Sequence, residues 1–152
     1  MTTLAFTSAG SKIYIGTAAI PNDGSFAGDA AAFAAQTYVE IKEVTDIGAI
    51  GKTFGMVAHN PVGDPTTYKL KTVSNTGTLA LKGARAPSDP GQAKLLAAVD
   101  SYLTYATKIV LQTGTILYVQ GLYMGYTTTV GTVSVITSFD CNVELSGNLI
   151  VV

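Results

Sequence analysis

The sequence predicts a mainly β chain with one α-helix. From Thr132 to Leu145 the odd positions are apolar and the even positions are mostly polar, which is typical of a strand with one face in the core. Further apolar runs of strand length are separated by turns rich in glycine and proline. A single segment, beginning at Asp89, combines a helix-start signal with a helical apolar stripe.

The final alternating segment is long for a strand. About fourteen residues at about 3.3 Å each span roughly 45 Å, whereas typical strands have about five or six residues. A small monomer has little use for so long a strand, but a sheet that is shared among subunits does. The alternation therefore indicates an assembly.

Composition points in the same direction. The 152 residues fit one domain that can bury a core without disulfides. Charged residues make up 12% of the chain, about half of the usual share of about 25%, while apolar residues make up 47%. No apolar run of about eighteen residues is present, and the first ten residues lack the features of a secretory signal. We expect no membrane span and extensive burial against protein partners; a compact soluble domain with few charges is the alternative.

The charge composition excludes a groove that binds the phosphate backbone of nucleic acid tightly. The net charge is −1, Arg85 is the one arginine, and no cluster of Lys and Arg is present to displace counterions. Cys141 is the one cysteine, so no internal disulfide can form. Because Cys141 belongs to the apolar set of the final strand, we predict that it is a small buried hydrophobe.

The first half of the chain predicts an arm, two strands and a loop. Residues 1–35 read as an N-terminal arm that contains a strand at Lys12–Ile20 and a short helix within Asp29–Gln36. Tyr38–Ile47 reads as a strand with a bulge near Lys42–Glu43. Gly48–Thr67 carries four glycines and two prolines and reads as a loop of about twenty residues.

The second half predicts a hairpin, a helix and a long pair of strands. Tyr68–Val73 and Thr78–Lys82 should form the hairpin. Asp89 as N-cap, Pro90 and Gln92 should start a helix that ends near Thr107, with Leu95, Leu96, Val99, Leu103 and Ala106 on its buried stripe. Strands follow at Ile109–Thr113 and Ile116–Tyr126. Gly147–Asn148 should break the final strand and leave Leu149–Val152 as an exposed apolar tail.

No pattern predicts an enzyme, a cofactor or a metal. Gly48–Thr53 lacks the first glycine of a phosphate loop, since position 46 is Asp46. His59 has no metal-ligand partners at suitable spacing. Glu40 and Glu43 point to opposite faces of one strand and do not make an acid–base pair. Tyr118, Tyr123 and Tyr126 could form an aromatic platform, but packing is the more frequent role of such residues.

The order of elements and two stretches of sequence resemble a known family. YVEIKEVTDIGAIGKTFG begins at Tyr38, SDPGQAKLLAA begins at Ser88, and the alternating final strand follows. Together they resemble the major tail tube proteins of long-tailed (siphovirus-type) bacteriophages, over about Lys12 to Leu145. The resemblance implies a single tail-tube domain over residues 1–152, built as two packed antiparallel sheets in a sandwich or barrel with one flanking helix.

The resemblance also implies an assembly. Six copies close a ring, and rings stack into a virion tail tube through which the DNA genome leaves the particle. It implies tape-measure and tail-terminator partners and assembly in the cytoplasm of a bacterial host. In the family, the arms and the long loop contact neighbouring copies. Here these contacts would fall on residues 1–35, on the loop 48–67 and on the C-terminal tail, with Gly48, Gly51, Lys52, Phe54, His59, Leu149, Ile150, Val151 and Val152 as candidates. The chain shows no additional C-terminal domain, so the tube should be smooth.

The polar face of the final strand is the candidate lining of the channel. It offers no cation, and its carboxylates would repel the backbone of double-stranded DNA and let it slide without specific binding. Its residues are Thr132, Ser134, Ser138, Asp140, Asn142 and Glu144. Two alternatives stay open: the inner tube of a contractile secretion-type machine, and a monomeric glycan-binding β-sandwich, which the absence of tryptophan disfavours.

Overall fold

The computed structural model describes residues 5–25 and 29–152. The parts of the expected arm at 1–4 and 26–28 lie outside the described residues. In chain order the elements are β1 (Lys12–Ile20), α1 (Ala30–Ala34), β2 (Tyr38–Ile41), β3 (Val44–Asp46), β4 (Thr53–His59), β5 (Tyr68–Asn75), β6 (Thr78–Ala84), α2 (Pro90–Asp100), β7 (Thr104–Val110), β8 (Ile116–Thr129) and β9 (Ser138–Val151).

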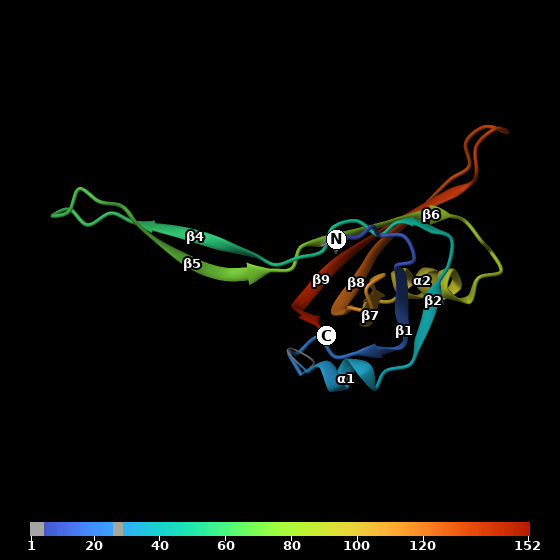
Figure 1. Cartoon of the computed structure of the whole chain (residues 1–152), viewed down its shortest axis with the longest axis horizontal. Coiled ribbons are helices and arrows are strands. Elements are labelled where there is room, and N and C mark those ends of the chain that lie inside the picture. Colours follow the sequence, from blue (N-terminus) through green and yellow to red (C-terminus); the bar gives the residue numbers. More distant parts are fainter. Residues whose placement is uncertain (1–4, 26–28) are drawn as a thin grey trace.

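The strands form two antiparallel sheets (Figure 1). The larger has seven strands in the order β2-β1-β7-β8-β9-β6-β3. Its two edge strands, β2 and β3, are consecutive in the chain, so the sheet curls until its edges approach each other. We call this sheet with α1 and α2 the body. The smaller sheet, β4–β5, projects far from the body; we call residues 52–75 the ribbon. The prediction of a mainly β fold with two sheets is confirmed.

The core lies inside the curled sheet. Alternate residues of each strand point into it, such as Ile13 and Ile15 of β1 and Leu79 and Leu81 of β6. The odd positions of β9 do the same, and Phe139, Cys141 and Val143 are at most 1% exposed. Helix α2 packs against β1, β2 and β8 and adds Leu95 and Ala98 to the core. The short α1 covers the outer face of the sheet, where Phe33 stacks on Tyr118.

Helix α2 begins where the sequence predicts but ends earlier. Asp89 is its N-cap and accepts a hydrogen bond from the backbone N–H of Gln92. The helix ends at Asp100 rather than near Thr107. The reason is that Tyr105, Thr107 and Ile109 alternate with a period of two and pair between β1 and β8, where all three are buried. Leu103 and Ala106 therefore lie beyond the helix.

Strand β5 has a different partner from the predicted one. It pairs with β4, which lies inside the segment Gly48–Thr67 that we expected to be a loop, while β6 pairs with β3 and β9. The side chains explain this outcome. Leu79 and Leu81 of β6 are fully buried in the body, whereas every residue of β5 is exposed. Core burial places β6 in the large sheet, and β5 pairs with the strand that precedes it.

The segment Tyr38–Ile47 contains a corner rather than a bulge. Glu43 has φ 60°, in the left-handed region that non-glycine residues rarely adopt. The chain turns there from β2, which pairs with β1, to β3, which pairs with β6. One continuous segment thus supplies both edges of the sheet.

The final strand is shifted relative to the prediction. Residues 132–137 form the tip of the β8–β9 hairpin, and Val133, Val135 and Ile136 are exposed there. Strand β8 ends at Thr129, so these residues have no neighbouring strand to pair with. At the other end, β9 continues to Val151. Gly147, with φ 73°, lies in a register shift that keeps the strand paired with β8 instead of breaking it.

Candidate assembly surfaces

The outer face of β6, β9 and β8 carries most of the predicted channel residues. Ser138, Asp140, Asn142 and Glu144 alternate with the core residues of β9 and therefore point outward. Asp140 lies between Lys82 of β6 and Thr127 of β8. Glu144 accepts a hydrogen bond of 2.9 Å from the Thr78 hydroxyl. Thr132 and Ser134 lie in the hairpin tip instead, so the structure brings together four of the six predicted residues.

The charges on this face are few and mostly negative. Asp46 of β3, Lys82 of β6 and Asp140 of β9 form one cross-strand row, in which the single lysine lies between two carboxylates. Glu144 is four residues further along β9. Around them the face is made of small or uncharged side chains such as Thr78, Ala80 and Asn142. A surface of this kind has no cluster of cations that could hold a phosphate backbone.

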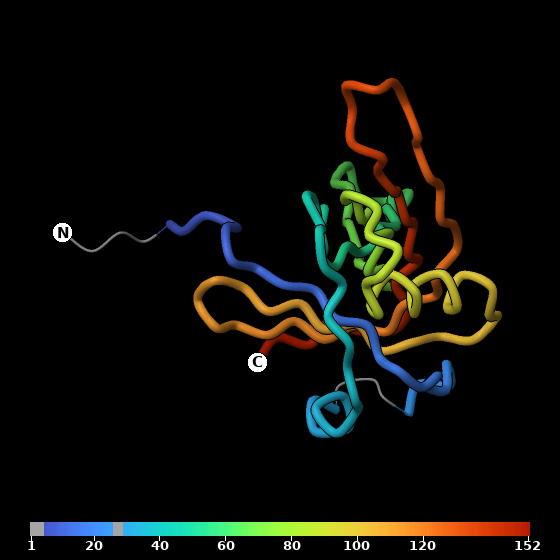
Figure 2. Tube along the Cα trace, turned by 90° about the vertical axis from the view of Figure 1, so that its right-hand side faces the viewer, coloured from blue at the N-terminus to red at the C-terminus, as the bar shows by residue number. Residues whose placement is uncertain are grey.

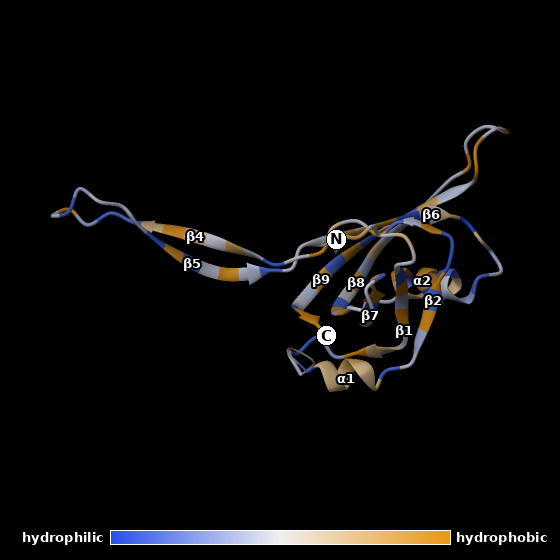
Figure 3. Ribbon diagram, viewed as in Figure 1, coloured by the Kyte–Doolittle hydropathy of each residue, from blue (hydrophilic) through white to orange (hydrophobic). Residues whose placement is uncertain are grey.

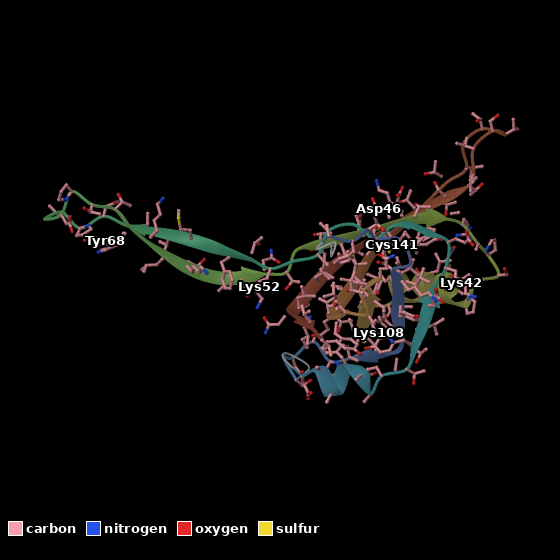
Figure 4. All side chains as sticks on the ribbon, in the orientation of Figure 1. Lys42, Asp46, Lys52, Tyr68, Lys108 and Cys141 are labelled. Carbon is pink, nitrogen blue, oxygen red and sulfur yellow. The ribbon has the colours of Figure 1, made fainter. Side chains whose placement is uncertain are left out.

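The ribbon is exposed along its whole length. All residues of β4 and β5 are solvent-exposed, including Phe54, Met56, Val57, Tyr68 and Leu70. Figure 3 shows apolar and polar segments that alternate along both strands. In Figure 4, Lys52 lies at the base of the ribbon and Tyr68 near its far end. An isolated two-stranded hairpin is marginally stable at best in water, so such a ribbon needs a surface to pack on.

The two faces of the ribbon differ in chemistry. On one face Val57 lies opposite Leu70 and His59 opposite Tyr68. On the other face Met56 lies opposite Lys71 and Ala58 opposite Lys69. Lys71 places its Nζ 4.8 Å from the centre of the Phe54 ring, and Lys52 places its Nζ 6.0 Å from it. We call these the valine face and the lysine face.

The far end of the ribbon is fixed by one carboxylate. Asp64 accepts a hydrogen bond of 2.6 Å from the Tyr68 hydroxyl and one of 2.9 Å from the backbone N–H of Thr66. These bonds favour the charged carboxylate, and the bond from Tyr68 has the larger effect. They hold the pKa of Asp64 below 3.8, and the same contact raises the pKa of Tyr68 above 10.0.

The remaining predicted contact residues lie at the base of the ribbon and at the end of β9. Gly48 has φ 84° and donates its N–H to Asp46, while Gly51 has open space around its Cα. Leu149 and Ile150 are half-buried, and Val151 and Val152 are exposed. This segment is not a free tail, because Val151 pairs with Leu117 and Val152 exchanges backbone hydrogen bonds with Ile116.

Two further exposed apolar groups were not predicted. The tip of the β8–β9 hairpin, which projects from the body in Figure 2, exposes Val130, Val133, Val135 and Ile136. The turn after α2 exposes Tyr102 and Leu103, and Tyr102 lines a shallow hollow with Met124 of β8. The sequence assigned Val133, Val135 and Ile136 to the final strand and Tyr102 and Leu103 to the helix, so their exposure could be found only once the true element ends were known.

The titratable side chains of the interior are buried and packed. Burial raises the pKa of the Cys141 thiol to about 12, so the thiol is not a nucleophile at neutral pH. Tyr118 and Tyr123 are buried, and Tyr126 stacks on Phe139, so these tyrosines pack rather than form an exposed platform. Within residues 5–25 and 29–152 no group of His, Cys, Asp and Glu could hold a metal ion, and no helix is long and apolar enough to cross a membrane.

The surface hollows are shallow. One open groove has a volume of about 280 Å³ and lies between β3, β6 and the start of β9. Its lining combines Phe139 and Ile136 with Lys82 and Asp140.

Comparison with known proteins finds the same fold among solved structures. No protein-family model matches the chain, and no curated protein matches it. Among solved structures, a chain of the anti-feeding prophage (AFP) baseplate, from a 6-fold symmetrised structure, matches with a TM-score of 0.71 and 13% identity over 100% of this chain and 97% of that one. The chain shares its fold with this baseplate chain.

Two other structures support the same statement. A chain of the PVC sheath/tube terminator, from an extracellular contractile injection system in its extended state, matches with a TM-score of 0.69 and 8% identity over 100% of this chain and 99% of that one. A chain from the tail of an empty GTA particle, refined with C6 symmetry, matches with a TM-score of 0.65 and 12% identity over 97% and 99%. At these identities the likeness shows the fold alone.

Proposed function

We propose that this protein is the major tail tube protein of a siphovirus-type bacteriophage. In this proposal six copies form a ring, and the rings stack into a tube that conducts double-stranded DNA during ejection. The observation that carries it is the ribbon, which is wholly exposed on a chain that shares its fold with chains of the AFP baseplate, the PVC sheath/tube terminator and the GTA tail. The six-fold symmetry of the AFP and GTA assemblies supports the ring of six.

The exposed apolar groups supply the contacts of such an assembly. The ribbon, with Lys52, Phe54 and His59, and its base at Gly48 and Gly51 would contact the next ring. The end of β9, from Leu149 to Val152, and the hairpin tip would contact other copies. The hairpin tip and the end of β9 carry no charged side chain, and depletion of charge is typical of interface cores. The partners are then other copies of this chain, with tape-measure and tail-terminator proteins at the two ends of the tube.

The outer face of β6, β9 and β8 is the proposed channel lining. Its sparse negative charge suits a surface past which DNA must slide, because no lysine cluster is available to neutralise phosphates. Ser138, Asp140, Asn142 and Glu144 are the residues that we assign to it. The protein would act by shape and charge, without a catalytic residue or a cofactor. It would be located in the virion tail, assembled in the bacterial cytoplasm.

A second candidate is the inner tube of a contractile injection machine. It is favoured by the similarity to chains of the AFP baseplate and of the PVC injection system. The two candidates differ in what surrounds the tube. Particles purified from producing cells through a tag on this chain should contain sheath subunits, detected by mass spectrometry, if the contractile reading holds, and DNA-filled capsids if the siphovirus reading holds.

Assembly itself can be tested with the purified chain. We expect rings and tubes in negative-stain images at high protein concentration, and a rise of scattered light as concentration increases. A protein that stays monomeric at every concentration and salt would contradict both tube candidates and would favour the monomeric β-sandwich.

A further inference from the structure

The ribbon must turn one of its two faces toward its partner, and these faces are not equivalent. The valine face carries Val57, Leu70 and Tyr68, with His59 at its end and no Lys, Arg, Asp or Glu in either strand. Thr72 follows Tyr68 and Leu70 at alternate positions of β5 and therefore lies on the valine face. Gly55 lies on the same face, because a Cβ added to it would collide with the Oγ1 of Thr72. The valine face is therefore flat at its base and apolar in its middle.

The lysine face carries every cation of the ribbon. Lys69 and Lys71 come from β5, and Lys52 approaches the ring of Phe54 from the base. Desolvating an ammonium group is costly, and lysine is depleted in the cores of protein interfaces. In addition, Lys71 covers the Phe54 ring at 4.8 Å, so the main apolar group of this face is partly shielded already.

Charge identifies the partner as another copy of the same chain. Residues 52–75 hold three lysines and one aspartate, for a net charge of +2, and the net charge of −1 for the whole chain leaves −3 for the remainder. The ribbon extends away from its own body (Figure 1), so it can reach the oppositely charged body of a second copy. Such a head-to-tail contact between unlike surfaces propagates into stacks.

We propose that the ribbon docks on the body of a second copy through its valine face, with Val57 and Leu70 at the centre of the contact, while Lys52, Lys69 and Lys71 stay solvated. This inference rests on the proposed function, because it needs an assembly. It changes two expectations drawn from the sequence: Lys52 and Phe54 belong to the lysine face and are not central contact residues.

Two matched double variants test the choice of face. Val57→Thr with Leu70→Thr removes the apolar centre of the valine face, and Phe54→Thr with Met56→Thr removes two residues of similar exposure from the lysine face. Threonine keeps the strand propensity in both variants. The measurement is the critical concentration for assembly, by sedimentation, together with hydrogen exchange of the ribbon. Protection of the buried Cys141 thiol from an aqueous thiol reagent reports that the body is folded.

We expect the valine-face variant to raise the critical concentration by about tenfold or more and the lysine-face variant to change it by less than about threefold, since about 1.4 kcal/mol of contact energy corresponds to a factor of ten. The reverse order overturns the assignment. Assembly of all three proteins at one critical concentration overturns it as well and leaves the proposed function intact. A wild-type protein that never assembles overturns the proposed function and this inference with it.

Discussion

At the scale of single residues, the corner at Lys42–Glu43 depends on the start of α2. The side-chain amide of Gln92 donates hydrogen bonds of 3.0 Å to the Lys42 carbonyl and 2.9 Å to the Ala84 carbonyl, and it accepts one of 2.9 Å from Ala86. Asp89 accepts one of 2.9 Å from the Lys42 N–H. The sequence predicted Asp89 and Gln92 as helix-start residues, but bonds to segments nearly fifty residues away leave no local signal.

Gly91 should be intolerant of any side chain. A Cβ added there would collide with the backbone of Glu40 and Ile41 in β2. We expect Gly91→Ala to lower the free energy of unfolding by about 1–3 kcal/mol, because a packed interior relaxes poorly around an added methyl group. Gly51→Ala, at a position with open space, is the control and should change stability little. Denaturant unfolding measures both, and equal stability of the two variants would contradict the packing of α2 against β2.

The pKa of Asp64 should depend on Tyr68. The folded pKa lies below 3.8, so this contact stabilises the ribbon end above about pH 3.8, and the stabilisation is lost as the pH falls through the lowered pKa. Tyr68→Phe removes the larger cause of the shift, so the pKa of Asp64 should rise toward 3.8. NMR titration of the Asp64 carboxyl carbon measures it. Tyr102→Phe, at an exposed tyrosine elsewhere, should leave it unchanged, and an unshifted value in Tyr68→Phe would mean that the contact does not persist in solution.

At the scale of elements, local signals predicted where elements lie better than which elements pair. Lys12–Ile20 and the start of α2 match the predictions because apolar alternation and helix caps are local features. The partner of β5 and the end of α2 do not match, because burial decides them. Leu79, Leu81 and Tyr105 enter the core of the body, and that choice leaves β5 to pair with β4. Similarly, the short stretch 132–137 alternates like a strand but has no neighbour.

The charge of the ribbon should govern how fast copies meet. Lys69→Glu with Lys71→Glu changes the ribbon from +2 to −2, so it would repel the negative body of a second copy. We expect slower assembly at low ionic strength and rates close to wild type near 1 M salt, where the Debye length is only about 3 Å. Time-resolved light scattering measures the rates.

A control variant separates ribbon charge from net charge. Lys12→Glu with Lys42→Glu alters the net charge equally but leaves the ribbon at +2, and it should not slow assembly. If assembly of both variants is slowed equally, the net charge of the chain rather than the charge of the ribbon controls the rate at which copies meet.

At the scale of the whole molecule, the sequence located one face of the candidate assembly but not its shape. The polar face of β9 was predictable from alternation, and four of its six proposed residues lie together. The ribbon, the hairpin tip and the corner that brings β2 and β3 to opposite edges depend on contacts between distant segments. Asp46 and Lys82, which flank the channel face, were missed because β3 and β6 adjoin β9 only in the folded sheet. Figure 4 places Asp46 on the body, away from the ribbon.

Reversing the charge of the proposed channel should slow DNA release. Asp140→Lys with Glu144→Lys alters two outward side chains, so particles should still assemble. The lining would then attract phosphates, and release should be slowed most at low ionic strength. Fluorescence of released DNA measures this effect. Asp23→Lys with Asp100→Lys makes the same change in net charge at exposed positions elsewhere and should release DNA like wild type. Unchanged release from tubes that contain the channel variant would contradict the lining assignment.

The place of β9 between β8 and β6 also has a consequence for synthesis of the chain. β9 follows every other described strand along the sequence, and it alone joins β6 and β3 to the rest of the large sheet. On the ribosome, no strand pairing therefore joins β2-β1-β7-β8 to β6-β3 until β9 emerges, although the corner between β2 and β3 links the two groups along the chain. Pairings between strands some sixty residues apart form slowly, because loop closure must come first. The outer face of β6, β9 and β8, which we propose as the channel lining, therefore forms only after the last strand has been made.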